Sequence, residues 1–175
     1  MKISYLAFAC SVLFGLSSSA GAHEEISSPS QAEGESRDLL QREISTHLAQ
    51  IKNKEDLQVY LTSMRGIQTP LDTLSPGAKR RFIESLVFTD RGLASFTYVD
   101  IRNELTLSEA YKLLALFGRE ATAASIRGMR VENEADRLIS QASAEAPLND
   151  YMDYWCRTTA TCTKKLEDIC VGPNC

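Results

Sequence analysis

Covalent cross-links near one end of the chain restrict its fold more than any other sequence feature. Four of the five cysteines in the 175-residue sequence lie in its last twenty residues. They are Cys156, Cys162, Cys170 and Cys175. A zinc site needs closer cysteine pairs and a thiol oxidoreductase needs Cys-x-x-Cys, and the segment has neither pattern. We therefore predict no metal here, but two disulfides that staple the segment to the protein.

The spacing of these cysteines leaves their pairing open, because four cysteines allow three connectivities. We favour local pairing, with Cys156 bonded to Cys162 and Cys170 bonded to Cys175. The alternative is an interlaced pairing that holds Cys175 back toward the last helix. Either arrangement would oppose fraying at this end of the chain.

The first 22 residues have the features of a secretory signal peptide. Lys2 precedes an apolar run over 3–16, and the small residues 17–22 end in an Ala-Gly-Ala cleavage pattern. We predict cleavage before His23, with an uncleaved anchor as the alternative. The fifth cysteine, Cys10, would be removed with the signal. We therefore expect an exported protein, periplasmic or secreted, in a compartment where disulfides form.

Charge and length limit the classes of partner. Cleavage would leave 153 of 175 residues, enough for one domain with a hydrophobic core. Because Lys2 is the one charged residue lost, 18 basic and 23 acidic side chains would remain. No basic run exceeds residues 79–81, so we expect no nucleic-acid partner. After residue 22 no stretch is apolar enough to span a membrane, and no cofactor motif is present.

Helical signals dominate the rest of the chain. We predict a flexible polar lead-in over 23–36, a helical domain over 37–155 and a Cys-rich tail over 156–175 packed on that domain. The predicted fold is all-α, a compact bundle of five or six short helices, with a short extended arm near 93–98 and a disulfide-stapled C-terminal tail. The predicted helices cover 37–52, 54–64, 76–88, 107–117, 132–143 and 147–156.

Three of these helices have specific local signals. The first carries Leu40, Ile44, His47 and Ile51 along one stripe. The helix over 107–117 begins with a capping box, in which Thr106 and the glutamate three residues later satisfy each other's backbone amides. The last has Tyr151 and Trp155 four residues apart, and we expect these rings to dock the tail onto the domain.

The most distinctive non-helical stretch, residues 87–106, mixes aromatic and charged side chains. Aromatic and arginine side chains are the usual energetic anchors of protein interfaces. The alternative is that the aromatic rings are core residues beneath a turn. The candidate binding residues are Phe88, Arg91, Phe96, Tyr98 and Arg102.

Signals for catalysis are weaker. His47 could act as a general base, although a histidine on an apolar stripe is more often a core or boundary residue. Asp90, Asp100 and Glu104 could supply paired carboxylates, although a solvated acidic face is the commoner origin of such a cluster. No serine lies in the context of a nucleophile elbow.

Three hypotheses about function follow. The first is an exported protein without catalysis that binds another protein, as an inhibitor, an immunity-type factor or an accessory factor. The second is a small envelope hydrolase that uses His47 or the three carboxylates. The third is a precursor of a C-terminal Cys-rich peptide, because Lys164 and Lys165 form a dibasic pair within the tail.

Overall fold

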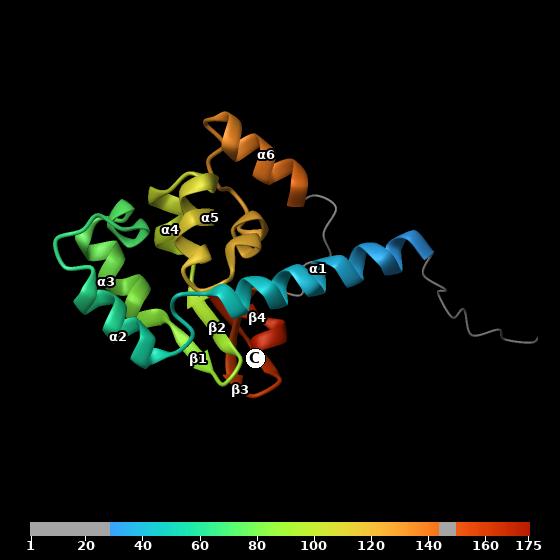
Figure 1. The fold of residues 1–175 in the computed structure, drawn as a ribbon, viewed down its shortest axis with the longest axis horizontal. Helices are drawn as coiled ribbons and strands as arrows, with labels where there is room; N and C mark the ends of the chain where they lie inside the picture. The colour runs from blue at the N-terminus through green and yellow to red at the C-terminus, as the bar shows by residue number, and fades with distance from the viewer. Residues whose placement is uncertain (1–28, 144–149) are drawn as a thin grey trace, which may run out of the picture.

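The computed structural model describes residues 29–143 and 150–175 (Figure 1). The predicted signal peptide, the cleavage site before His23 and residues 23–28 of the predicted lead-in lie outside the described residues. The described residues form helices and a four-stranded antiparallel sheet. The fold is therefore mixed α and β, and the all-α prediction is wrong.

Helices come first along the chain, and the two longest strands come last. The elements, with η marking a 3-10 helix, are α1 (Pro29–Leu48), α2 (Lys54–Ser63), η1 (Pro70–Thr73), α3 (Pro76–Ser85), β1 (Val87–Thr89), β2 (Gly92–Thr97), α4 (Val99–Glu104), α5 (Leu107–Ala115), η2 (Glu120–Ser125), α6 (Glu134–Ser143), β3 (Asp150–Thr158), β4 (Thr161–Val171) and η3 (Gly172–Asn174). Helix α1 thus begins inside the segment predicted to be a lead-in. The extended arm predicted near 93–98 lies in β2.

The sheet joins the middle of the chain to its end. The strand order is β1-β2-β4-β3, so β4 lies between β2 and β3. Phe96 of β2 is opposite Ile169 of β4, and Met152 of β3 is opposite the same Ile169. The Cys-rich segment is therefore an inner strand of the sheet. It is not a tail laid over a finished helical domain.

The predicted helix over 147–156 is the main error. Its first residues, 147–149, lie outside the described residues, and from Asp150 onward the segment is β3. Tyr151, Met152, Tyr154 and Trp155 are residue types that favour strands. The spacing of the aromatic rings suggested a helix face, but pairing with β4 decides the conformation, and this pairing is not visible in the local sequence.

The core lies between the helices and the sheet. Phe82 of α3 packs edge-on against Phe96 of β2 and against Phe117, which follows α5, with ring centroids 6.0 Å apart in both pairs. Ile169 and Val171 of β4 are fully buried in the same cluster. The end of the chain therefore supplies part of the main core.

The best local prediction is confirmed at α5. The Thr106 amide donates to Glu109 Oε2 at 2.8 Å, and the Glu109 amide donates back to Thr106 Oγ1 at 3.4 Å. These two bonds are the predicted capping box. Leu113 and Leu114 are fully buried, as expected for a central helix.

Two disulfides close the C-terminal hairpin, but not in the local pairing that we favoured. Cys156 is bonded to Cys175 and Cys162 to Cys170, with Cα atoms 5.5 and 5.9 Å apart. The β3–β4 ladder is interrupted, because Lys164 is opposite Tyr154 while Ile169 is opposite Met152. The intervening residues leave the ladder, and this excursion brings Cys162 and Cys170 together.

The sulfur atoms of these cysteines form one cluster. The Sγ atoms of Cys156, Cys170 and Cys175 lie within 4.8 Å of one another and are buried. Metals bind thiolates, whereas each of these sulfurs is part of a disulfide. In this oxidised state the cluster is structural.

Candidate functional site

The five residues predicted to bind a partner do not share one surface. Phe96 is fully buried and Tyr98 is 4% exposed, so both are core residues. Phe88 is half-buried and tilted against Phe117, with ring centroids 6.3 Å apart. Arg102 lies over the Tyr98 ring at 5.4 Å. Arg91 is exposed in the turn between β1 and β2, whereas Arg102 lies on α4.

The carboxylates predicted for catalysis are also separated. Asp100 is paired with Arg81 of α3, whose Nε and Nη2 donate to it at 3.0 and 2.5 Å. Glu104 accepts hydrogen bonds from the Ser75 amide and hydroxyl at 2.7 and 2.8 Å, at the start of α3. Both carboxylates therefore support helices. Asp90 lies elsewhere, at a pocket that it shares with His47.

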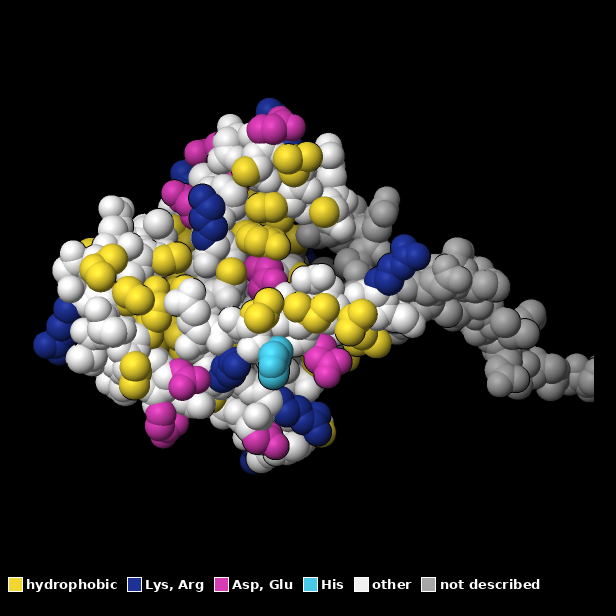
Figure 2. Space-filling view, in the orientation of Figure 1, with side chains coloured by type: hydrophobic (Ala, Val, Ile, Leu, Met, Phe, Trp, Pro, Cys, Tyr) yellow, Lys and Arg dark blue, Asp and Glu magenta, His cyan; other side chains and the backbone are white. Residues whose placement is uncertain are grey.

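This pocket, which we call the α1–η3 pocket, has a volume of about 520 Å³. It lies between α1, the β1–β2 turn and η3. Its lining residues are Leu39, Arg42, Glu43, Thr46, His47, Lys52, Asp90, Arg91, Gly92, Arg119, Pro173 and Asn174. Figure 2 shows cationic and acidic side chains close together beside α1. Of the residues singled out from the sequence, His47, Asp90 and Arg91 are brought together here.

Arg119 is the unusual member of the pocket, because it is charged and only 3% exposed. Its Nη2 donates to Thr46 Oγ1 and, at 2.9 Å, to Asn174 Oδ1. Its Nε is buried and has no hydrogen-bond partner among the described residues. Burial lowers the pKa of Arg119, and the nearby Asp150 carboxylate acts in the opposite direction.

A second arginine, Arg42, is bonded to the buried carboxylate of Asp150, and Arg119 is not. Arg42 Nη1 lies 3.2 Å from Asp150 Oδ2, and the Asp150 side chain is fully buried. Thr122 Oγ1 donates to the same oxygen at 2.6 Å. The Nη2 of Arg42 is buried without a partner in the described part of the chain. The fully buried carboxylate of Asp150 is therefore near two guanidinium groups, but it is bonded to that of Arg42 and not to that of Arg119.

Backbone geometry brings α1 close enough to form this arrangement. Gly118 has a φ of +64°, a left-handed conformation that side chains disfavour. A Cβ atom at Gly118 would lie 2.4 Å from the carbonyl oxygen of Ser45 in α1. Only glycine leaves room for this approach. The Ser45 hydroxyl also donates to Glu120, which adds a polar contact beside the glycine.

A neighbouring side of α1 carries an exposed apolar stripe. Leu40, Ile44 and Leu48 are 58%, 42% and 74% exposed. Leu40 and Ile44 belong to the predicted stripe of the first helix; of its other members, His47 lines the α1–η3 pocket, and Ile51 follows α1 and is fully buried. Figure 2 shows hydrophobic side chains in a row along α1. We call Leu40, Ile44 and Leu48 the α1 stripe.

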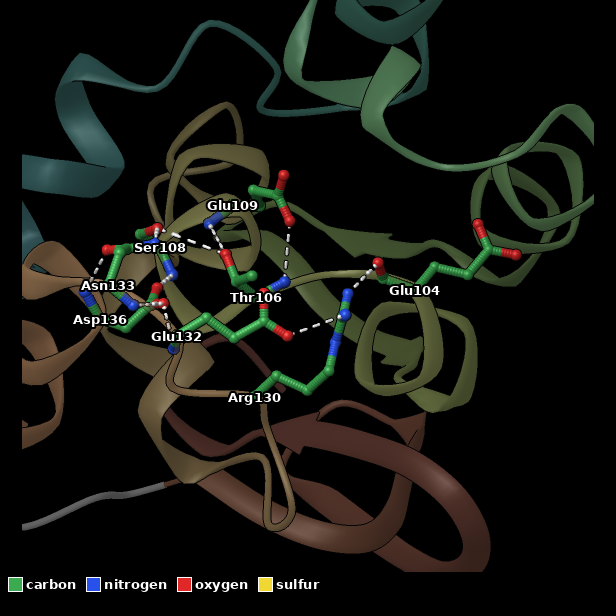
Figure 3. Close-up of polar contacts among 8 residues, drawn as sticks. All are labelled: Glu104, Thr106, Ser108, Glu109, Arg130, Glu132, Asn133 and Asp136. Carbon is green, nitrogen blue, oxygen red and sulfur yellow. Dashed lines mark hydrogen bonds and ion pairs between the residues drawn. The ribbon is translucent and has the colours of Figure 1, made fainter.

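Another polar cluster, around Asp136, joins α5 to α6 (Figure 3). Asp136 is fully buried and accepts from the amides of Ser108, Glu132 and Asn133 at 2.6, 2.8 and 3.0 Å. Burial acts to raise the pKa of Asp136, but these donors outweigh it and hold the pKa far below its ordinary range. Every oxygen of the carboxylate has a protein partner, so this cluster is a structural joint.

Comparison with known proteins adds no functional information, since no protein family, curated protein or solved structure matches the chain. Within the described ranges, no helix has the length and apolar character needed to cross a bilayer. Sequence reasoning missed Arg42, Arg119 and Asp150. Single charged residues carry no local signal of burial.

Proposed function

We propose that the chain is an exported protein that binds another protein through the α1 stripe. The observation that carries this proposal is the exposure of Leu40, Ile44 and Leu48, three large apolar side chains one turn apart on one helix. Such a row at i, i+4 and i+8 is the pattern by which a helix binds an apolar groove of a partner.

The energetics favour a partner that covers the stripe. Burying one Leu or Ile side chain contributes about 1.5–3 kcal/mol, so three of them could supply most of a specific interaction. The stripe lies in the C-terminal half of α1, and its three side chains are exposed although Ser45 of the same half packs on Gly118.

The proposed location rests on the cysteines and on the predicted signal peptide. Two disulfides among the described residues are typical of proteins that fold in oxidising compartments. We infer a periplasmic or secreted protein, with roles such as inhibitor, immunity-type factor or accessory factor. All three roles require a protein partner and no chemistry of the chain's own.

The other two hypotheses have less geometric support. The hydrolase would need its carboxylates in one cleft, but Asp100 and Glu104 support α3 and lie apart from His47. The peptide precursor would need a cut at Lys164 and Lys165 to release the tail. Both disulfides span this pair, so the two products of such a cut would stay covalently joined.

The proposal is tested by photocrosslinking in the cells that export the protein. A photoreactive residue replaces Leu48, which is the most exposed residue of the stripe at 74%. We expect a discrete crosslinked product with a second protein, and we expect the double variant Leu40→Ser, Ile44→Ser to lose it.

Val59→Ser is the matched control, because Val59 is 67% exposed but lies on α2. It should leave the crosslink unchanged. The proposal fails if no product forms, or if the stripe variant and the Val59→Ser control give equal yields. A product with twice the chain mass would identify a second copy as the partner.

A further inference from the structure

Arg119 presents a problem that the described residues do not solve. A buried cation is costly unless an anion compensates it, and the effective penalty is several kcal/mol. Among the described residues Arg119 forms no ion pair. The one fully buried carboxylate nearby, Asp150, is already bonded to Arg42 and Thr122.

We propose that the α1–η3 pocket binds a small molecule with an oxyanion group, a carboxylate or a phosphate, and that Arg119 is its buried anchor. This site is separate from the α1 stripe. It goes beyond the proposed protein-binding function and does not depend on it.

The charges that line the pocket favour an anion. With Arg42 paired to Asp150, the lining cations Lys52, Arg91 and Arg119 outnumber the lining acids Glu43 and Asp90. Glu120 also lies near Arg119, but it is bonded to the Ser45 hydroxyl. Guanidinium groups match carboxylate and phosphate oxygens in a planar, two-point geometry.

Buried hydrogen-bond donors also favour an anionic ligand. Arg119 Nε and Arg42 Nη2 are buried donors without partners in the described part of the chain. Unsatisfied buried donors are uncommon in proteins and need an explanation, such as a missing ligand. The partners that Arg119 does have, Thr46 and Asn174, are neutral and hold the guanidinium in place without neutralising it.

The size and lining of the pocket define the ligand further. A volume of about 520 Å³ lies within the range of small-molecule pockets, roughly 300–1,000 Å³. Leu39 and Pro173 add apolar surface on opposite sides, from α1 and from η3. The ligand therefore has an anionic group for Arg119 and a short apolar body.

Calorimetric titration of the full disulfide-bonded exported chain tests this site. The probes are inorganic phosphate and hexanoate, each added at an ionic strength kept constant with sodium chloride. We expect saturable binding of at least one probe with one site per chain. The probe that binds more tightly shows whether the anionic group is a phosphate or a carboxylate.

Three variants locate the binding. Arg119→Met should abolish it and should still fold, because it removes the desolvation penalty of a buried cation and breaks no ion pair among the described residues. Arg91→Ala, at the exposed rim, should weaken it about tenfold, the effect of one charge-assisted hydrogen bond. Arg80→Ala is the matched control, since Arg80 is exposed on α3 outside the pocket, and it should bind like the unchanged protein.

Clear results would overturn the proposal. It fails if neither probe binds saturably to the unchanged protein. It also fails if Arg91→Ala and Arg119→Met bind as tightly as Arg80→Ala. Should Arg119→Met not fold, Arg91→Ala decides the question alone. The stripe variant Leu40→Ser, Ile44→Ser should keep its anion binding, so failure here and failure of the protein-binding proposal are distinguishable.

Discussion

The sheet core and the attachment of α1 are held together by different forces. The core joins Phe82, Phe96 and Phe117 to the end of the chain through apolar contacts, and disulfides close the hairpin beside it. Helix α1 is attached through arginines, a buried carboxylate and close backbone contact at Gly118. Its own large apolar side chains face outward.

This difference indicates which part of the molecule can gain stability from a ligand. The apolar core is packed from the described residues themselves and needs no ligand to complete it. Among the described residues, the α1 attachment leaves buried donors unpaired and an apolar stripe uncovered, so it can gain stability from a bound anion and from a protein partner. The two proposed sites therefore lie on one helix, and the core is their support.

The largest expected effect is in the core. Phe96→Ala should lower the free energy of unfolding by about 3–5 kcal/mol, because it empties a fully buried site in contact with Phe82. Urea denaturation measures this loss. A loss below about 1 kcal/mol would show that the helices do not depend on the sheet, and the comparison would fail.

The two disulfides provide a second test of the region around the sheet core. Cys156→Ser with Cys175→Ser opens a loop of 19 residues, and Cys162→Ser with Cys170→Ser opens one of 8. The chain-entropy relation predicts losses of about 3 and about 2.5 kcal/mol. Thermal unfolding of the two double variants should show this order. In each double variant the two remaining cysteines should still form their disulfide. If they do not, the observed pairing of the four cysteines is contradicted.

The α1 attachment should respond to one methyl group. Gly118→Ala places a Cβ atom 2.4 Å from the Ser45 carbonyl oxygen and forces a left-handed conformation on alanine. We expect a loss of about 1–3 kcal/mol. Hydrogen exchange should increase in α1 and η2 and stay slow in β2 and β4.

Gly128→Ala is the control for Gly118→Ala. Gly128 also has a positive φ, +81°, but its Cβ position is 3.7 Å from the nearest atom, the Arg102 side chain. It should not change exchange in α1. Equal exchange in α1 for both variants would show that the close approach at Gly118 does not hold the helix.

The smallest expected effect is a dependence of stability on pH. The buried polar contacts of Asp136 should depend on pH, whereas the apolar core should not. The pKa of Asp136 is lower in the folded than in the unfolded protein, where it is near 3.9. Its stabilising contribution is therefore present above about pH 4 and declines as the pH falls toward the folded value. Between pH 6 and about pH 2.5, the urea midpoint should fall further for the unchanged protein than for Asp136→Asn. Parallel curves would contradict this role.

The parts predicted well from the sequence are those that depend on neighbouring residues. The capping box at Thr106 involves only the consecutive residues from Thr106 to Glu109. The stripe of Leu40 and Ile44 was also found correctly as a helical pattern. Its periodicity does not say whether the face is covered, so its exposure came only with the structure.

The sequence by itself determined the capped start of α5, the helical character of that central segment and the four cysteines whose even number implies two disulfides. The tertiary structure alone decided three things: that Tyr151 and Trp155 belong to a strand, how the cysteines pair, and that Arg119 is buried beside Arg42 and Asp150. The physical reason is the range of the interactions. Capping and helical periodicity act within a few residues, whereas strand pairing and burial depend on segments far apart in the chain.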